Sequence, residues 1–150
     1  MTESVTVHAS AVLDGERGVL IRGGAGSGKS SLLLGLLTDA AASTWLIADD
    51  RVMLTPANGR LIAAVPPVLA GRLEIRGQGI VRRRFVSPAR IHLVVDLLPL
   101  AECDRMPAPR QAETVSIASI ELPLLRLPIG LADGPVRVRA AVAERLLPRR

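Results

Sequence analysis

One short stretch, GGAGSGKSS at residues 23–31, constrains the fold of this chain more than any other. Gly23, Gly28, Lys29 and Ser30 fit the pattern G-x-x-x-x-G-K-[S/T], which binds phosphate where it follows a strand and opens a helix. Here the apolar run GVLIR comes before the pattern and the helix-forming run SLLLGLL comes after it. The segment therefore predicts a strand, a phosphate-binding loop and a helix within an α/β fold.

The composition supports this interpretation, because Lys29 is the only lysine among the 19 lysine and arginine residues. A phosphate loop needs a compact ammonium group between the β- and γ-phosphates, whereas arginine presents a wide planar fork. Backbone N–H groups and the helix N-terminus bind the remaining phosphate oxygens, and the Ser30 hydroxyl reaches Mg²⁺. The expected nucleotide-binding residues are Gly23, Gly24, Ala25, Gly26, Ser27, Gly28, Lys29, Ser30 and Ser31.

The length and composition predict a single domain over residues 1–150. A chain of 150 residues is long enough for a hydrophobic core of its own. Apolar residues make up 49% of the chain, but its aromatic residues are one Trp and one Phe, so Leu, Val, Ile and Ala must fill the core. The single cysteine, Cys103, excludes an internal disulfide and favours a reducing, cytoplasmic compartment. We interpret Cys103 as a bystander thiol.

Two classes of partner are disfavoured. The formal charge of +5 suggests nucleic acid, but the arginines are scattered and the aromatic side chains on which bases stack are nearly absent. The longest apolar stretches, LLLGLL and IHLVVDLLPLA, are far shorter than the ~20 residues of a membrane span. The N-terminal residues lack the pattern of a signal peptide. We therefore expect binding to neither nucleic acid nor a membrane.

The rest of the chain predicts further elements from its apolar periodicity and its turn residues. In chain order they are a buried strand in STWLIADD, a hairpin in RVMLTPANGRLIAAV, mostly loop with a short helical or extended piece over residues 66–90, and a strand in IHLVVDLL. They continue with an exposed loop over residues 99–111, one or two strands in TVSIASIELPLLRLPI, and a closing helix in DGPVRVRAAVAERLL. Pro135 suits the first turn of that helix, although the alternation of Val136 and Val138 also fits a strand.

Two neighbouring carboxylates, Asp49 and Asp50, end the strand that follows the phosphate loop. Successive side chains of a regular strand point to opposite faces, so both can reach the nucleotide only if the strand has already ended. Such a pair can divide the work, one holding the metal shell and the other accepting a proton from an attacking hydroxyl. The alternative is that Asp50 caps a turn and pairs with Arg51.

A third carboxylate, Glu74, lies between Arg72 and Arg76 and precedes a flexible Gly-Gln-Gly stretch. By its chemistry alone this segment fits either a part of the site or a solvated row of ion pairs. The function of the run Arg82, Arg83 and Arg84 also has two interpretations, a docking surface or a solvated basic patch.

The phosphate loop, LIADDRV and LEIRGQGI together resemble the catalytic domain of the HPr kinase/phosphorylase family, bacterial enzymes that phosphorylate a serine of the phosphocarrier protein HPr. The EIRG-x-GI element is the signature of that family. The resemblance spans residues 7–97, with a weaker match in LPLLRLPI. The chain resembles the short form of the family that is found in alphaproteobacteria. It implies a P-loop kinase domain with a mixed central sheet and flanking helices.

The resemblance also implies roles for individual residues. His8 matches a family histidine that precedes the phosphate loop, whereas by itself it fits a structural histidine at the start of a strand. Asp49 and Asp50 match the acidic pair that serves as catalytic base and metal partner. Glu74 matches a carboxylate linked to Mg²⁺, and Arg76 lies in the signature, where it supports the phosphate site.

The activity implied by the resemblance is transfer of a phosphoryl group from ATP, with Mg²⁺, to HPr or an HPr-like phosphocarrier. It further implies the reverse phosphorylase reaction, a homo-oligomer (a hexamer) and a cytoplasmic location. The Gly-Arg-Asn element that the family carries near its C-terminus has no counterpart in PIGLADGPVRVR. Two alternatives stay open, a nucleotide-binding sensor without transfer activity and a P-loop kinase for a small metabolite.

Overall fold

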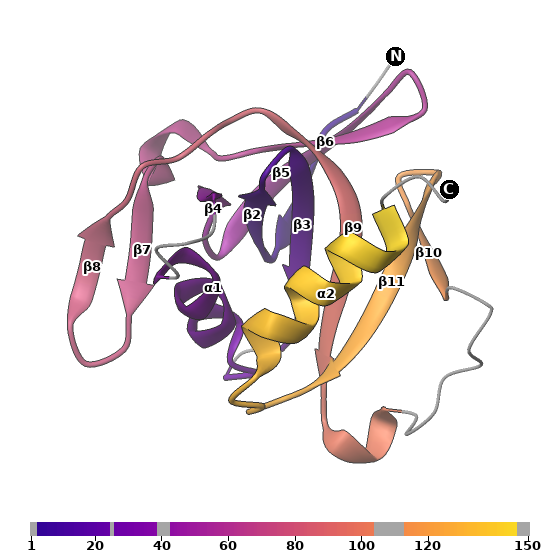
Figure 1. Ribbon diagram of the computed structural model, residues 1–150. Helices are drawn as coiled ribbons and strands as arrows, with labels where there is room; N and C mark the ends of the chain where they lie inside the picture. The colour runs from indigo at the N-terminus through magenta and orange to yellow at the C-terminus, as the bar shows by residue number, and fades with distance from the viewer. Residues whose placement is uncertain (1–2, 25, 39–42, 104–112, 147–150) are drawn as a thin grey trace.

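The computed structural model describes residues 3–24, 26–38, 43–103 and 113–146, and its centre is a mixed sheet of nine strands (Figure 1). Seven strands follow the order β1-β5-β6-β9-β3-β2-β4, with β11 beside β9 and β10 beside β11. The strands are β1 (Val5–His8), β2 (Ser10–Asp14), β3 (Arg17–Arg22), β4 (Thr44–Ala48), β5 (Arg51–Ala57), β6 (Arg60–Ala64), β9 (Ala89–Leu98), β10 (Thr114–Ile117) and β11 (Ile120–Pro128). The pairs β3–β9 and β9–β11 are parallel and the others are antiparallel, which confirms the predicted mixed sheet.

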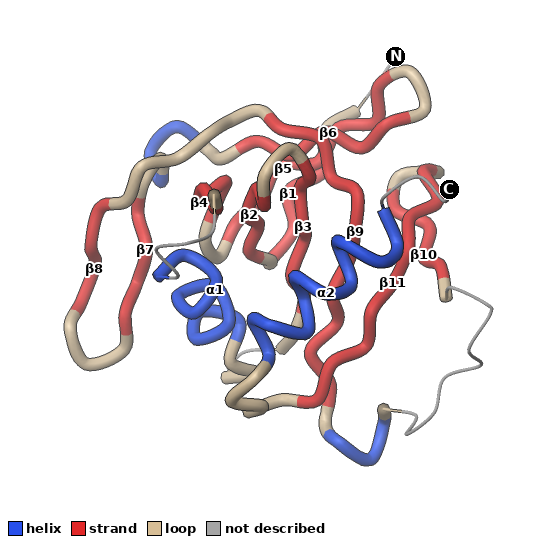
Figure 2. The backbone as a smooth tube through the Cα atoms, in the orientation of Figure 1, coloured by secondary structure: helices blue, strands red, loops and turns tan. Residues whose placement is uncertain are grey.

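Two helices, α1 (Lys29–Thr38) and α2 (Gly134–Leu146), cover the same face of this sheet (Figure 2). Their apolar faces pack on the central strands in one hydrophobic core. The helices also touch each other, because Gly35 of α1 leaves room for Pro135 at the start of α2. The Arg139 side chain donates a hydrogen bond to the carbonyl oxygen of Leu36 near the end of α1. Neither helix of the described chain is long and apolar enough to span a membrane.

A second core forms on the other face, with side chains of β2, β3 and β4 packed against those of β5, β6, β9 and β11. The buried apolar side chains of both cores are leucine, valine, isoleucine and alanine, as the composition predicts. The packing of these strands fixes the positions of the ends of β3 and β4, which the glycine loop and the two aspartates follow.

The structure shows more order in residues 66–90 than the expected loop with a short helical or extended piece. The segment contains both kinds of element, the 3₁₀ helix η1 (Pro67–Leu69) and an antiparallel hairpin of β7 (Arg72–Ile75) and β8 (Gly79–Arg82). The hairpin turns at Gly77 (φ 85°) and Gly79 (φ 98°), a left-handed backbone that glycine adopts without strain. The glycines that suggested a loop therefore make a tight turn between two strands.

The other predicted elements are confirmed, including the hairpin β5–β6, strand β9 and the closing helix with Pro135 in its first turn. The segment TVSIASIELPLLRLPI forms two strands, β10 and β11. The expected loop over residues 99–111 begins with the 3₁₀ helix η2 (Leu100–Glu102), and residues 104–111 lie outside the described part of the chain.

Candidate functional site

The glycine loop (residues 23–28) connects the end of β3 to the first residue of α1. Gly26 (φ 76°) and Gly28 (φ 88°) have left-handed backbone conformations, which explains why glycine occupies both positions. The Ser27 N–H donates a hydrogen bond to the Gly24 carbonyl oxygen at 3.0 Å, which tightens the turn. The loop therefore delivers the N-terminus of α1, with its unpaired N–H groups, to the surface.

Lys29 lies at the first position of α1 and is 8% exposed. Its Nζ donates hydrogen bonds to the carbonyl oxygens of Gly23 at 2.7 Å and Gly24 at 3.1 Å. The ammonium group is thus held over the mouth of the loop by the loop's own backbone. A cation at the N-terminus of a helix is in a position to attract an anion.

The strand β4 ends at Ala48, and Asp49 and Asp50 lie in the bend that follows. Their side chains therefore need not point to opposite faces, as successive side chains of a strand do. Both carboxylates line the same pocket. Asp49 is 8% exposed, and its oxygens accept hydrogen bonds from the Ser10 hydroxyl at 2.9 Å and from the Glu74 N–H at 3.2 Å. Asp50 has a left-handed backbone (φ 71°), a conformation that aspartate tolerates better than most residues.

His8 pairs with Asp50, its Nε2 lying 2.6 Å from Oδ1 of the carboxylate. The antiparallel register of β1 and β5 places His8 opposite Arg51, the residue after Asp50, which explains how the two meet. Both side chains are more than half exposed, at 55% for His8 and 64% for Asp50. The partner of Asp50 is therefore His8 rather than Arg51, in an arrangement open to solvent.

Sequence reasoning missed Ser10, which is fully buried in β2. Its hydroxyl donates to Asp49 and accepts a hydrogen bond from the Asp50 N–H at 3.3 Å, so one side chain orients both acidic residues. The signal for this role is the pairing of β2 with β4, in which Ala11 lies opposite Ala48. That pairing is visible only in three dimensions.

Arg22 and Asp96 form a second pair that the sequence did not indicate. Arg22 ends β3 directly before the glycine loop, and its guanidinium donates to both carboxylate oxygens of Asp96 on β9, at 2.7 and 2.9 Å. Two parallel hydrogen bonds fix orientation as well as distance. The pair therefore ties the entrance of the glycine loop to the central strand.

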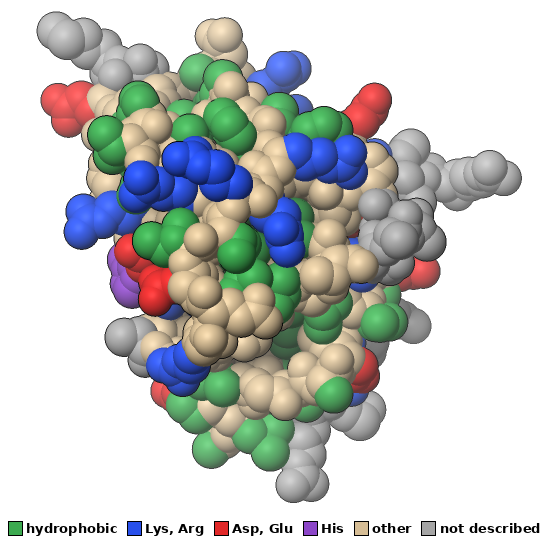
Figure 3. Space-filling view, turned by 90° about the vertical axis from the view of Figure 1, so that its left-hand side faces the viewer, with side chains coloured by type: hydrophobic (Ala, Val, Ile, Leu, Met, Phe, Trp, Pro, Cys, Tyr) green, Lys and Arg blue, Asp and Glu red, His purple; other side chains and the backbone are tan. Residues whose placement is uncertain are grey.

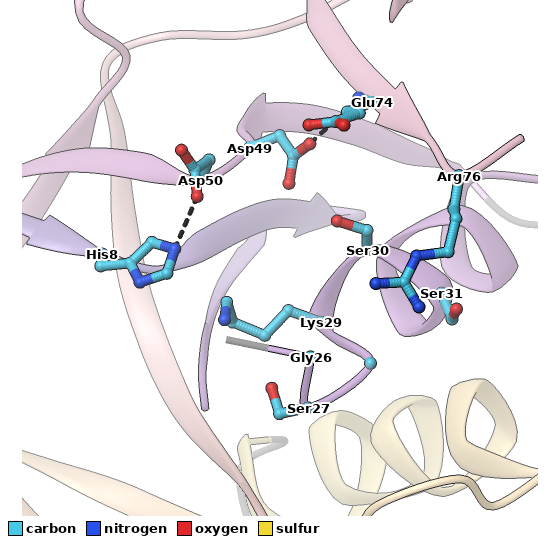
Figure 4. Close-up of a pocket in the computed structure, with 11 residues that line it drawn as sticks. His8, Gly26, Ser27, Lys29, Ser30, Ser31, Asp49, Asp50, Glu74 and Arg76 are labelled. Atoms are coloured by element: carbon cyan, nitrogen blue, oxygen red, sulfur yellow. Dashed lines mark hydrogen bonds and ion pairs between the residues drawn. The ribbon is translucent and has the colours of Figure 1, made fainter. Parts of the chain in front are cut away.

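The hairpin β7–β8 brings in the remaining polar side chains. Glu74 lies on β7, and Arg76 is the first residue after that strand. Figure 4 shows Lys29 and Ser30 facing Asp49 and Glu74 across the pocket, with Arg76 reaching toward Ser30 and Ser31. The pocket has a volume of about 310 Å³ and is lined by His8, Gly26, Ser27, Gly28, Lys29, Ser30, Ser31, Asp49, Asp50, Glu74 and Arg76.

Thus the structure gathers nearly all of the predicted site residues in one pocket. Gly23 and Gly24 do not line it, but their carbonyl oxygens hold Lys29. Ala25 lies outside the described residues. Ser27 lines the pocket with a buried hydroxyl that has no hydrogen-bond partner. Because a buried polar atom without a partner is rare, this hydroxyl suggests that the loop binds a polar ligand.

The pocket also fits Mg²⁺ by its chemistry. Ser30, Asp49, Asp50 and Glu74 supply hard oxygen donors from three separate elements. In the described residues, no three histidine, cysteine, aspartate or glutamate side chains lie close enough to hold a metal ion by themselves. A Mg²⁺ site usually combines one or two carboxylates with waters and substrate phosphates.

Comparison with known proteins agrees with this geometry. The family model "HPr Serine kinase C-terminal domain" matches residues 1–146. The chain belongs to this family. Among curated HPr kinase family members, the HPr kinase/phosphorylase of Mycoplasma mycoides is 30% identical over 138 residues, which is 85% of this chain and 43% of that protein. The HPr kinase/phosphorylase of Neisseria meningitidis is 32% identical over 162 residues, 95% of this chain and 49% of that protein.

A solved structure of the same family has the same fold. The structure of the Hpr(Ser) kinase/phosphatase from Coxiella burnetii superposes with a TM-score of 0.82 at 28% identity, covering 95% of this chain and 96% of that chain. The present chain spans less than half the length of the curated relatives described above.

Proposed function

We propose that this chain is an ATP- and Mg²⁺-dependent protein-serine kinase whose acceptor is HPr or an HPr-like phosphocarrier. The observation that carries the proposal is the convergence of Lys29, Asp50 and Glu74 on one pocket from three distant parts of the sequence. Family membership adds the acceptor, because the relatives are named for action on HPr. The relatives are also named as phosphorylases, so the proposal includes the reverse reaction on phosphorylated HPr.

ATP binds with its phosphates against the glycine loop and the N-terminus of α1. Backbone N–H groups of the loop and the ammonium of Lys29 neutralise the β- and γ-phosphates. The buried hydroxyl of Ser27, which lacks a partner, donates to a phosphate oxygen. Arg76 reaches the same end of α1 and supports the transferred phosphoryl group.

Ser30 and Glu74 would hold Mg²⁺, and Asp50 lines the same pocket as these two residues. The ion supplies charge neutralisation where negative charge gathers in phosphoryl transfer. Asp49 contributes differently, because Ser10 and the Glu74 backbone already engage its two oxygens. It ties β7 to the end of β4 and so positions Glu74.

Asp50 is the base that accepts the proton of the serine hydroxyl. It is the exposed member of the acidic pair, so an acceptor protein arriving from solvent can reach it. His8 holds one oxygen of the carboxylate and so fixes Asp50 at the edge of the pocket. In the forward reaction the serine oxygen attacks the γ-phosphorus in line, the bond to ADP breaks, and the proton goes to Asp50. In the reverse reaction inorganic phosphate attacks the phosphorus of phosphoserine and forms pyrophosphate, the bond to the serine oxygen breaks, and the protonated Asp50 gives its proton to that oxygen.

The acceptor approaches along the face that carries β7–β8. Figure 3 shows several Lys and Arg side chains gathered over the upper part of that face, near acidic and histidine side chains at its edge. Arg82 is the last residue of β8, and Arg83 and Arg84 follow it directly. The Arg84 guanidinium lies over the Trp45 ring, 4.0 Å from the ring centroid. Such a basic surface speeds the approach of an acidic partner.

The test compares the protein with its Asp50→Asn variant in an assay with labelled ATP, Mg²⁺ and purified HPr. We expect transfer by the unaltered chain to fall by about 100-fold or more in Asp50→Asn, because general base catalysis contributes roughly that much. ATP affinity should change little, since Asp50 lies outside the glycine loop. A nucleotide sensor would instead bind ATP without transfer in either form, and a metabolite kinase would leave HPr unlabelled. Either result would overturn the proposal.

A further inference from the structure

The hairpin β7–β8 has two different faces. Side chains alternate along each strand, and two residues directly opposite each other in an antiparallel pair share a face. One face packs through Leu73 on the core that α1 shares with the sheet. The other face carries the two neighbouring cross-strand pairs, Arg72 with Arg82 and Glu74 with Ile80, all of them exposed residues. These four residues form what we call the outer face of the hairpin.

The outer face continues directly from the pocket. Glu74 belongs to both, because it lines the pocket and lies opposite Ile80 in the hairpin. Ile80 is 64% exposed, so a large apolar side chain meets water next to the pocket wall. Arg72 precedes Glu74 by two residues on β7, and it therefore lies roughly 7 Å further along the same face. A protein whose serine enters the pocket beside Glu74 would lie against this face.

The arginine pair of the outer face is unfavourable for the hairpin itself. Arg72 lies directly opposite Arg82, so their Cβ atoms are about 5 Å apart, and like charges in this position destabilise a strand pair. Glu74 is the neighbouring carboxylate, but within the described residues no ion pair joins it to either arginine. The row of ion pairs that this segment could form is thus not made. The charges of the two arginines instead fit an acidic group of another molecule.

We propose that the outer face of the hairpin selects the acceptor, and that it fits a protein with an apolar side chain beside the acceptor serine and an acidic side chain beyond it. Ile80 covers the apolar side chain and excludes water next to Glu74. Arg72 and Arg82 together bind the acidic side chain, since guanidinium groups match the two oxygens of a carboxylate. The inference rests on the proposed kinase function. Figure 3, which faces the hairpin side of the molecule, shows basic side chains gathered near acidic and histidine side chains.

The test measures docking of purified HPr in two ways, as the KM for HPr in the transfer assay and as its Kd by calorimetry without ATP. The double variant Arg72→Gln, Arg82→Gln removes both charges of the outer face. The control variant Arg60→Gln, Arg90→Gln removes two exposed charges near the start of β6 and β9. Both variants change the net charge equally, so a difference between them reports on the place of the charges.

We expect the double variant to raise the KM and the Kd for HPr by about tenfold, because two charge-assisted partners of the acidic side chain are lost. Its affinity for ATP should stay the same, since neither Arg72 nor Arg82 lines the pocket. Its Tm should not fall, because a repulsion between opposite residues has been removed. The control variant should bind HPr as the unaltered chain does.

The apolar contact has its own pair of variants. Ile80→Thr keeps a β-branched side chain on β8 but removes apolar surface, and we expect it to raise the Kd for HPr by about fivefold or more. Val68→Thr is the matched control, because Val68 is 78% exposed on η1 and lies outside the outer face. Its Kd for HPr should be unchanged.

Replacement of the acidic residues of HPr, one at a time, identifies the partner of the arginine pair. One of these HPr variants should bind the unaltered chain more weakly, and it should lose little further affinity for the double variant, because the two changes remove the same contact. If every acidic residue of HPr contributed independently of Arg72 and Arg82, the proposed contact would be excluded.

Three further results would overturn the proposal: equal KM and Kd in the double variant and the unaltered chain, an equal loss in the control variant, or a lower Tm in the double variant, which would make the arginines structural. HPr would still be phosphorylated in each case, so the proposed kinase function would stand. If the unaltered chain neither bound nor labelled HPr, the kinase function and this inference would fail together.

Discussion

The replacement of Ser10 by alanine should damage both the stability and the activity of this protein. Its hydroxyl is fully buried and makes two hydrogen bonds, one to the Asp49 carboxylate at 2.9 Å and one from the Asp50 N–H at 3.3 Å. A bond to a charged group contributes about 1.5–3 kcal/mol and a neutral one about 0.5–1.5 kcal/mol. Ser10→Ala should therefore lower the free energy of unfolding by about 2–4 kcal/mol. For a domain of this size that corresponds to about 4–16 °C in Tm.

The assay is thermal and urea unfolding of the variant, alongside the rate of phosphoryl transfer to HPr below the melting transition. Ser4→Ala is the matched control, because Ser4 makes an exposed hydrogen bond to the Thr55 hydroxyl at 2.6 Å. Its unfolding free energy should change by less than ~0.5 kcal/mol. If Ser10→Ala were as stable as Ser4→Ala and equally active, Ser10 would not orient the acidic pair, and the reasoning from its two contacts would be refuted.

Three further changes test other parts of the structure. Asp96→Asn weakens the paired hydrogen bonds to Arg22, so the free energy of unfolding, measured with urea, should fall by about 1 kcal/mol. ATP affinity, measured by calorimetry, should fall as well. Gly35→Ala places a methyl group 2.6 Å from Cγ of Pro135, so it should destabilise by about 1–3 kcal/mol, but it should stabilise once Pro135→Ala has made room. Partial burial and the charges of nearby arginines lower the folded-state pKa of His92 below 6.5, so the unfolded state binds more protons; stability should fall as the pH drops through about 6.5, and less so in His92→Gln.

Much of the pocket could be predicted from the sequence because its signals are local. The glycine pattern requires a left-handed backbone at Gly26 and Gly28, and both adopt it. The two carboxylates at the end of a buried strand were expected to converge if the strand ended first, and β4 ends at Ala48. Patterns of this kind need only the adjacent residues to be interpreted.

The parts that sequence reasoning missed depend on contacts between distant segments. Ser10 is an ordinary polar residue in the sequence, and only the pairing of β2 with β4 shows that it holds Asp49. The extra residue in β9, His92, likewise shows only in the register of β3 against β9. The hairpin β7–β8 was expected only as a short helical or extended piece within a loop, because its glycines mark turns and loops alike. No periodic pattern in the sequence records any of these three features.

The measurement that tests the central claim most directly is transfer of the labelled γ-phosphate of ATP, with Mg²⁺, to HPr and to an HPr in which alanine replaces the acceptor serine. The account predicts label on the unaltered HPr and none on the alanine form. Binding of ATP, measured in the same preparation, shows that the protein is competent. An ATP-binding preparation that labels neither form, or both equally, would contradict the assignment as a kinase of that serine.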